Sequence, residues 1–162
     1  TLLVAWSASK SFLQYGARVG CLLGVALDPE ERQRMMNALA YSCRGVWSNC
    51  NHAGLLAVTQ LLTDPELKVR VTRERERAKA LLSERVALFN EKAERLGLKT
   101  PRYEGGFFVA VFAEDAPATA ARAREKGVFV VPMDGALRVA LCATPTSDIP
   151  RLVQVLAVAA EG

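Results

Sequence analysis

The sequence has little of what metal-binding, secreted and membrane-spanning proteins need. Its one histidine is His52, and its four cysteines include no Cys-x-x-Cys pair. Because structural zinc sites are built from clustered cysteine and histidine ligands, no metal site is expected. The thiols are expected to be buried and unpaired, in a reducing cytoplasm. No apolar run approaches the roughly 20 residues that cross a bilayer, so no secretory or membrane-spanning segment is expected.

A strongly basic surface is also missing. Lysine and arginine together number 21 against 17 aspartates and glutamates, for a net charge of +4. The densest basic segment, residues 73–77, alternates Arg and Glu, as a solvated helix face does. No aromatic residues are interleaved with it, so nucleic-acid binding is not expected. A composition of 51% hydrophobic and 23% charged residues is typical of a soluble globular protein, which we expect to be cytoplasmic.

The order of apolar and polar segments is typical of an α/β protein. Residues 1–6 form an apolar, strand-like run, so the chain is expected to start in the middle of a fold. Residues 19–27 are apolar almost throughout, which favours a strand covered on both faces. Asp28 followed by Pro29 is a helix-start signature. Residues 44–51 are expected to be an irregular connection.

A long helix is expected in the middle of the chain. A helix over 52–62 precedes it, and a second start signature at 63–66 opens it, with apolar residues recurring on one face until Gly97 and Pro101. About 33 residues would span roughly 50 Å, so this helix is expected to bridge two domains. The remainder is expected to be an α+β unit with a strand at 106–113, a helix at 116–126, paired strands at 128–131 and 137–142, and a closing helix at 147–160 capped by Ser147.

Lys10 is a candidate for cofactor chemistry on residue types alone. It lies between small hydroxyl residues, after one apolar strand and before another. An uncharged lysine amine forms a Schiff base with an aldehyde cofactor. Arg18 stands at the edge of the next apolar run, and an arginine with two serine hydroxyls is a natural phosphate-binding group. The alternative is a surface turn with solvated Lys10 and Arg18, and residue types alone leave both interpretations open.

Residues 7–20 (SASKSFLQYGARVG) resemble the cofactor-lysine signature of class I (aspartate and aromatic) aminotransferases, in which Ser-x-Ser-Lys precedes Phe, Tyr and Arg-Val-Gly. Segments that resemble the family follow in the same order at 47–49, 62–67, 105–108 and 137–140. The resemblance covers essentially all 162 residues. It implies an α/β fold, the C-terminal portion of a fold-type-I transferase that depends on pyridoxal 5'-phosphate (PLP). The implied parts are the last part of the large PLP-binding domain and its sheet at 1–63, a long interdomain helix at 64–97, and a small α+β domain at 98–162.

The resemblance implies an enzyme that passes the amino group of a dicarboxylic or aromatic L-amino acid to 2-oxoglutarate. Lys10 would hold PLP as a Schiff base and shuttle the proton between substrate and cofactor. Ser7, Arg18 and, more weakly, Ser9 would bind the phosphate. Arg138 would grip the substrate α-carboxylate through two parallel hydrogen bonds. The alternative for Arg138 is an exposed strand residue in an ion pair.

Arg44 stands three residues before Trp47, as does the family's arginine for the distal carboxylate of dicarboxylic substrates. In the family that arginine reaches into the neighbouring subunit's site, so the resemblance also implies a homodimer. The alternative is a helix C-terminal arginine that binds the last carbonyl groups.

Two departures from the family pattern stand out. Residues 50–52 (Cys-Asn-His) replace two usual prolines, so this loop is expected to be looser, and His52 would face the substrate, or cap or pack at a helix start. The family's aspartate for the pyridine nitrogen, and the groups on the cofactor ring, should lie before residue 1. The chain is therefore expected to be an incomplete part of the enzyme. The alternative is a catalytically inactive fragment that acts only as a dimerisation or binding module.

Overall fold

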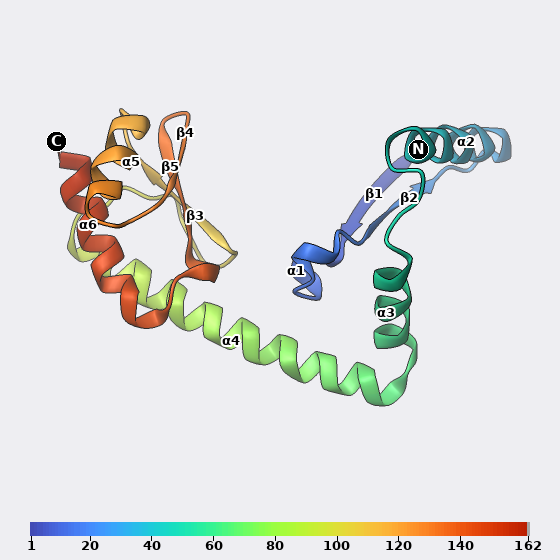
Figure 1. Cartoon of the computed structure of the whole chain (residues 1–162), viewed down its shortest axis with the longest axis horizontal. Coiled ribbons are helices and arrows are strands. Elements are labelled where there is room, and N and C mark those ends of the chain that lie inside the picture. Colours follow the sequence, from blue (N-terminus) through green and yellow to red (C-terminus); the bar gives the residue numbers. More distant parts are fainter. Residues whose placement is uncertain (162) are drawn as a thin grey trace. The chain divides into compact units, whose positions relative to one another are not determined.

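The computed structural model describes residues 1–161, which form two compact units, Thr1–Glu76 and a second that starts at Arg77 (Figure 1). Each unit has its own hydrophobic core. The elements of the first unit are β1 (Leu2–Ser7), α1 (Ala8–Ser11), the 3-10 turn η1 (Tyr15–Ala17), β2 (Gly20–Val25), α2 (Pro29–Val46) and α3 (His52–Thr63). Helix α4 (Pro65–Arg95) runs across the division between the units.

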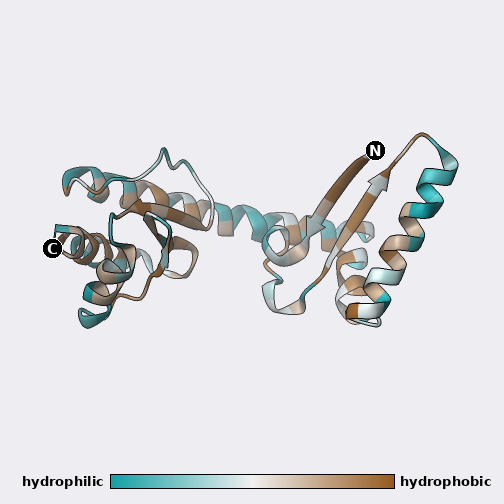
Figure 2. Cartoon of the chain, turned by 90° about the horizontal axis from the view of Figure 1, so that it is seen from above, coloured by the Kyte–Doolittle hydropathy of each residue, from teal (hydrophilic) through white to brown (hydrophobic). Residues whose placement is uncertain are grey.

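Strands β1 and β2 form an antiparallel ribbon, in register from Leu2 opposite Val25 to Ser7 opposite Gly20. Figure 2 shows both strands as strongly hydrophobic, yet Leu23 is 54% exposed and Val25 56% exposed. The prediction of a strand covered on both faces is therefore wrong for residues 1–161. The reason is that their sheet has two strands here, and helix α2 buries none of its own residues.

The cysteines follow the same pattern. All four are free, as predicted, but Cys21 on β2, Cys43 on α2 and Cys50 are exposed, and Cys142 is half-buried. The prediction that the thiols are buried is wrong for the three exposed ones, because no further layer covers β2, α2 or the connection that follows α2 within the described residues. None of the helices within residues 1–161 combines the length and the apolar character that a bilayer span requires.

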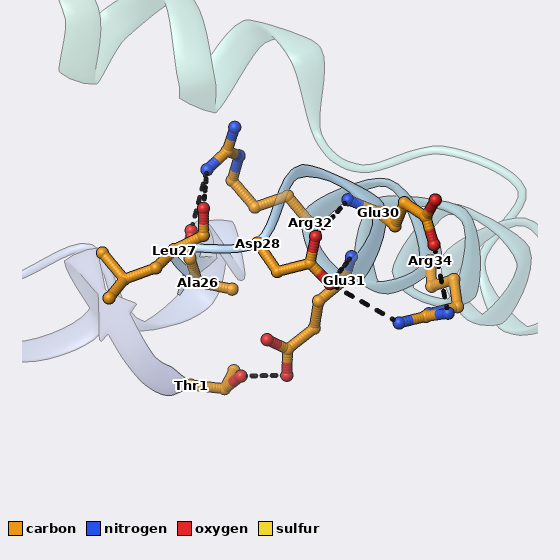
Figure 3. A network of polar contacts seen from close by, with 8 residues as sticks. All are labelled: Thr1, Ala26, Leu27, Asp28, Glu30, Glu31, Arg32 and Arg34. Carbon is orange, nitrogen blue, oxygen red and sulfur yellow. Dashed lines mark hydrogen bonds and ion pairs between the residues drawn. The ribbon is translucent and has the colours of Figure 1, made fainter.

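Helix α2 begins where the sequence predicted. The Asp28 carboxylate accepts hydrogen bonds from the backbone N–H groups of Glu30 and Glu31, and Pro29 occupies the first helical position. Figure 3 shows this network, in which Arg32 also donates to the carbonyls of Ala26 and Leu27, at 2.9 and 3.0 Å. The helix ends later than predicted, at Val46, so the expected irregular connection from residue 44 is wrong in its first residues.

The first unit's core is small and lies around the loop that joins β1 to β2. It consists of the buried residues Ala8, Phe12, Val19 and Val58, with Trp6 and Leu55 among the side chains packed against it. Trp6 meets Phe12 edge to face, with ring centroids 6.0 Å apart. Helix α3, predicted over 52–62, therefore supports the loop that carries Lys10.

Helix α4 confirms the predicted start and the predicted apolar face. The Asp64 carboxylate accepts from the N–H groups of Glu66 and Leu67, and the helix continues for 31 residues. Val86, Phe89 and Ala93, which recur three and four apart, are the buried residues of this helix.

The second unit is a three-stranded antiparallel sheet with helices on one face. Its elements are β3 (Phe108–Phe112), α5 (Ala116–Glu125), β4 (Val131–Met133), β5 (Ala136–Ala140), the 3-10 turns η2 (Leu141–Ala143) and η3 (Thr146–Asp148), and α6 (Ile149–Glu161), with the strands in the order β3-β5-β4. Alternate strand residues point into the core, where Val109, Val111, Leu137 and Val139 are almost fully buried.

Several predicted boundaries in this unit are wrong: β3 starts at Phe108 and not at 106, and β5 ends at Ala140 and not at 142. Strand β4 starts at Val131 and not at 128, because the N–H of Val128 donates to the Ala123 carbonyl and closes the end of α5. The closing helix starts at Ile149, and the predicted cap Ser147 lies in the preceding 3-10 turn, where its hydroxyl donates to Asp148.

Candidate functional site

The candidate site is the loop between β1 and β2, which the sequence folds into a short, tightly bonded turn. Ser7 caps the four-residue helix α1, since its Oγ accepts from the Ser9 N–H at 3.2 Å. The Ser7 hydroxyl also donates to the Ser9 hydroxyl, with the two oxygens 2.8 Å apart. Ala8, fully buried, donates its N–H to the Val19 carbonyl and so ties the start of the loop to its end.

Lys10 and Arg18 meet at one aromatic ring. The Lys10 Nζ lies 4.6 Å from the centroid of the Tyr15 ring, and the Arg18 Cζ lies 5.1 Å from the same centroid. Arg18 also donates from Nη1 to the Tyr15 carbonyl at 3.2 Å. Its backbone is left-handed (φ +53°, ψ +47°), which residues with a Cβ rarely adopt. The structure therefore brings Ser7, Ser9, Lys10 and Arg18 into a single loop of mixed hydroxyl and cationic character.

Arg138 belongs to the second unit. It lies in the centre of β5, opposite Ala110 on β3 and Val131 on β4, and its side chain is exposed. Its guanidinium Cζ lies 5.0 Å from the centroid of the Phe108 ring. The contact is therefore to an aromatic ring on the exposed face of the sheet rather than to a carboxylate, which leaves the fork of N–H donors free of an ion pair within residues 1–161.

Arg44 occupies the last turn of α2. Its Nη1 donates to the carbonyl and the hydroxyl of Ser48, at 3.3 and 3.1 Å. Ser48 is itself left-handed, with φ +64°. This is the arrangement expected of an arginine that binds carbonyl groups at a helix C-terminus.

Asn51 is a residue whose importance the sequence analysis missed. Its Oδ1 accepts from the Gly54 N–H at 3.1 Å and caps α3, and its Nδ2 donates to the Ala17 carbonyl at 2.8 Å. One amide thus joins the start of α3 to the residue before Arg18. The available signal was an asparagine directly before a helical pattern. His52, which is exposed, is the first residue of α3 and does not cap it.

Two further residues support the strand pair that carries Arg138. Arg85 on α4 donates from Nη1 to the carbonyls of Leu141 and Cys142, at 3.2 and 2.7 Å, just after β5. The Tyr103 hydroxyl donates to the Gly106 carbonyl at 2.6 Å and holds the segment before β3. Burial raises the pKa of Tyr103, and the neighbouring Cys142 thiol adds to the effect.

The chain has the fold of the fold-type-I PLP-dependent transferases, since solved aminotransferases superpose on 97% to 99% of it. A solved aminotransferase from Anaerococcus prevotii has this fold: it superposes with a TM-score of 0.90 at 30% identity, over 99% of this chain and 40% of its own. The family model for aminotransferase class I and II matches residues 1–156, and this chain belongs to that family.

Two curated relatives fall in the same family. An aromatic-amino-acid aminotransferase of Paracoccus denitrificans is 37% identical over 67 residues, which is 41% of this chain and 17% of the relative. A mitochondrial aspartate aminotransferase of Arabidopsis thaliana is 33% identical over 95 residues, which is 58% of this chain and 22% of the relative. The matched parts are thus well under half the length of these relatives.

Proposed function

We propose that this chain carries the lysine and the anion-binding groups of a PLP-dependent aminotransferase that passes an amino group from a dicarboxylic or aromatic L-amino acid to 2-oxoglutarate. The observation that carries the proposal is the β1–β2 loop, where two serine hydroxyls lie 2.8 Å apart and Lys10 and Arg18 share one ring. The names of the two relatives, an aromatic-amino-acid aminotransferase and an aspartate aminotransferase, support the same two substrate classes.

The donor set of this loop fits the cofactor. A phosphate dianion takes hydrogen bonds from hydroxyls and a guanidinium, which Ser7, Ser9 and Arg18 offer, and an aldehyde takes a primary amine, which Lys10 offers. PLP supplies, when bound, the electron sink for bond breaking at the substrate Cα. Lys10 would hold the aldehyde of that cofactor, and its amine would also be the group that moves the proton at the substrate Cα.

The two arginines outside the loop would select the substrate. Arg138 would bind the α-carboxylate, since its guanidinium projects from an exposed sheet face where no carboxylate of residues 1–161 pairs with it. Arg44 would bind the distal carboxylate of a dicarboxylic substrate in the site of a second subunit, so the proposal includes a homodimer. For this role Arg44 would have to exchange its bonds to Ser48 for the substrate.

The proposal also places the chain in the C-terminal part of a longer cytoplasmic enzyme. Residues 1–63 would complete a large PLP-binding domain, 64–97 would form the interdomain helix and 98–162 the small domain. The family's remaining cofactor-binding groups would then come from chain outside residues 1–162.

A second candidate is a catalytically inactive module that only dimerises or binds a partner. The observation that favours it is the exposed apolar ribbon, where Leu2, Leu3, Leu23 and Val25 are each more than half exposed. Apolar surface of this kind is typical of an interface.

Cofactor capture by the purified chain distinguishes the two. PLP is added over a concentration series, reduced with borohydride, and the adduct is mapped by peptide mass spectrometry, with Lys10→Arg as the control. The aminotransferase proposal expects the adduct to form mainly on Lys10. Competing inorganic phosphate should lower its yield. Diffuse labelling of surface lysines, with Lys10 no more reactive than Lys126, would contradict it and favour the binding module.

A further inference from the structure

The ring of Tyr15 is in contact with both cations of the candidate site. Lys10 Nζ and Arg18 Cζ lie 4.6 and 5.1 Å from its centroid, both within the roughly 6 Å over which a cation is attracted to a ring face. Tyr15 is 65% exposed as a residue, so core packing does not force its ring there. Tyr15 lies in the turn η1, and its backbone carbonyl accepts a hydrogen bond from Arg18 Nη1; both hold the ring in place.

Two positive groups that share one ring repel each other, and the repulsion is strongest before an anion arrives. The face of an aromatic ring carries partial negative charge and attracts both cations without adding a formal charge. The Tyr15 ring thus offsets part of the repulsion that a phosphate would otherwise have to overcome. The left-handed backbone of Arg18 points to the same constraint, because that residue is held in an uncommon conformation next to the ring.

We propose that Tyr15 is a positioning residue, whose ring keeps the Lys10 amine and the Arg18 guanidinium together so that the loop is ready for a phosphate-bearing aldehyde. The inference rests on the proposed function for the identity of that ligand. It does not rest on it for the ring contact, which belongs to the chain without cofactor. The phenolic hydroxyl takes no part, since the attraction is to the face of the ring.

The first test measures the chain without cofactor. Competitive acylation with a limiting amount of acetic anhydride reports how fast Lys10 reacts relative to Lys126. Tyr15→Leu, which keeps an apolar side chain and removes the ring, is expected to raise the relative rate at Lys10 by about two- to fivefold, the size of one exposed cation–ring contact. Tyr15→Phe keeps the ring and is expected to match the parent, as is Tyr41→Leu at an exposed tyrosine of α2.

The second test measures anion capture by the same variants. Tyr15→Leu should require about two- to fivefold more PLP for half-maximal labelling of Lys10, and Tyr15→Phe should restore the parent value. Circular dichroism identifies any variant that has lost its fold. If Tyr15→Leu matches the parent in both measurements, or if Tyr15→Phe behaves as Tyr15→Leu does, the ring has no positioning role. Failure of the parent chain to label Lys10 with PLP would refute the proposed function, and the acylation rates would still decide the role of the ring.

Discussion

The guanidinium of Arg44 is bonded to Ser48 four residues further along the chain, with Nη1 3.3 Å from the Ser48 carbonyl oxygen and 3.1 Å from its hydroxyl oxygen. This bonding closes the C-terminal turn of α2, where a positive charge is also favoured by the helix dipole. The two hydrogen bonds hold the Arg44 side chain at the C-terminal end of α2. Any distal carboxylate that Arg44 binds must therefore compete with an acceptor pair that is already present.

Substitution of Ser48 tests this arrangement. Ser48→Ala removes the hydroxyl acceptor and keeps the left-handed backbone at φ +64°, so we expect the free energy of unfolding to fall by about 0.5–1 kcal/mol. Ser48→Gly removes the same hydroxyl but favours that backbone, so its loss should be smaller. Urea denaturation of both variants measures the difference. A glycine variant less stable than the alanine variant would show that the backbone at residue 48 is not the constraint.

Asn51 is expected to link the fold of α3 to anion binding. Asn51→Ala removes the helix cap and the bond to the Ala17 carbonyl, and should cost about 1–2 kcal/mol. Asn51→Asp keeps the cap, since aspartate accepts equally well, but loses the donor to Ala17 and with it the support of Arg18. We therefore expect Asn51→Asp to cost less stability but to need more PLP for labelling of Lys10. If Asn51→Asp and the parent chain need the same PLP concentration, the Asn51 amide does not support anion binding by the loop.

Two helical glycines form a matched pair. A Cβ at Gly54 would collide with Cγ2 of Val19, which is buried, and meet Nδ2 of Asn51 at 3.0 Å, whereas a Cβ at Gly45 would meet open space. Gly54→Ala should therefore lower the melting temperature. Gly45→Ala should raise the stability by about 0.5–1 kcal/mol, because alanine is the better helix former. Thermal denaturation compares them, and a stabilising Gly54→Ala would show that Val19 moves aside without cost.

Tyr103 is expected to make the free energy of unfolding depend on pH in the alkaline range. Because burial raises its pKa, the folded chain keeps the phenolic proton at a pH where the unfolded chain has lost it. The folded state then binds more protons than the unfolded state, so the free energy of unfolding is expected to fall as the pH rises above about 10 and through the folded pKa. Deprotonation also removes the hydrogen bond to the Gly106 carbonyl.

The measurement is the free energy of unfolding from pH 8 to pH 11, in the parent chain and in Tyr103→Phe. The variant should be less stable at pH 8, where the hydroxyl bond is lost, and should show a shallower decline above pH 10. Tyr41→Phe, at an exposed position on α2, serves as the control and should keep the parent slope. A Tyr103→Phe profile parallel to the parent's would refute the assignment.

Local signals in the sequence located the starts of α2 and α4 correctly. Asp28 and Asp64 each cap a helix through their own carboxylates, and a cap of this kind needs only the next three residues. The buried face of α4, with Val86, Phe89 and Ala93, followed from the spacing of apolar residues for a similar reason. Strand ends were less predictable, since the Val128 N–H is taken by the end of α5 and not by a strand.

The sequence by itself determined the family, the position of the candidate lysine and its neighbouring serines, and the long helix, because each depends on residues close together in the chain. Only the tertiary structure decided that β2 is exposed, since exposure depends on which distant segments lie against a strand. It also decided that Lys10 and Arg18 share the ring of Tyr15, in a loop whose backbone is left-handed at Leu13 and Arg18. Neither residue is a glycine, so the local sequence did not predict this left-handed backbone, which only the folded loop shows.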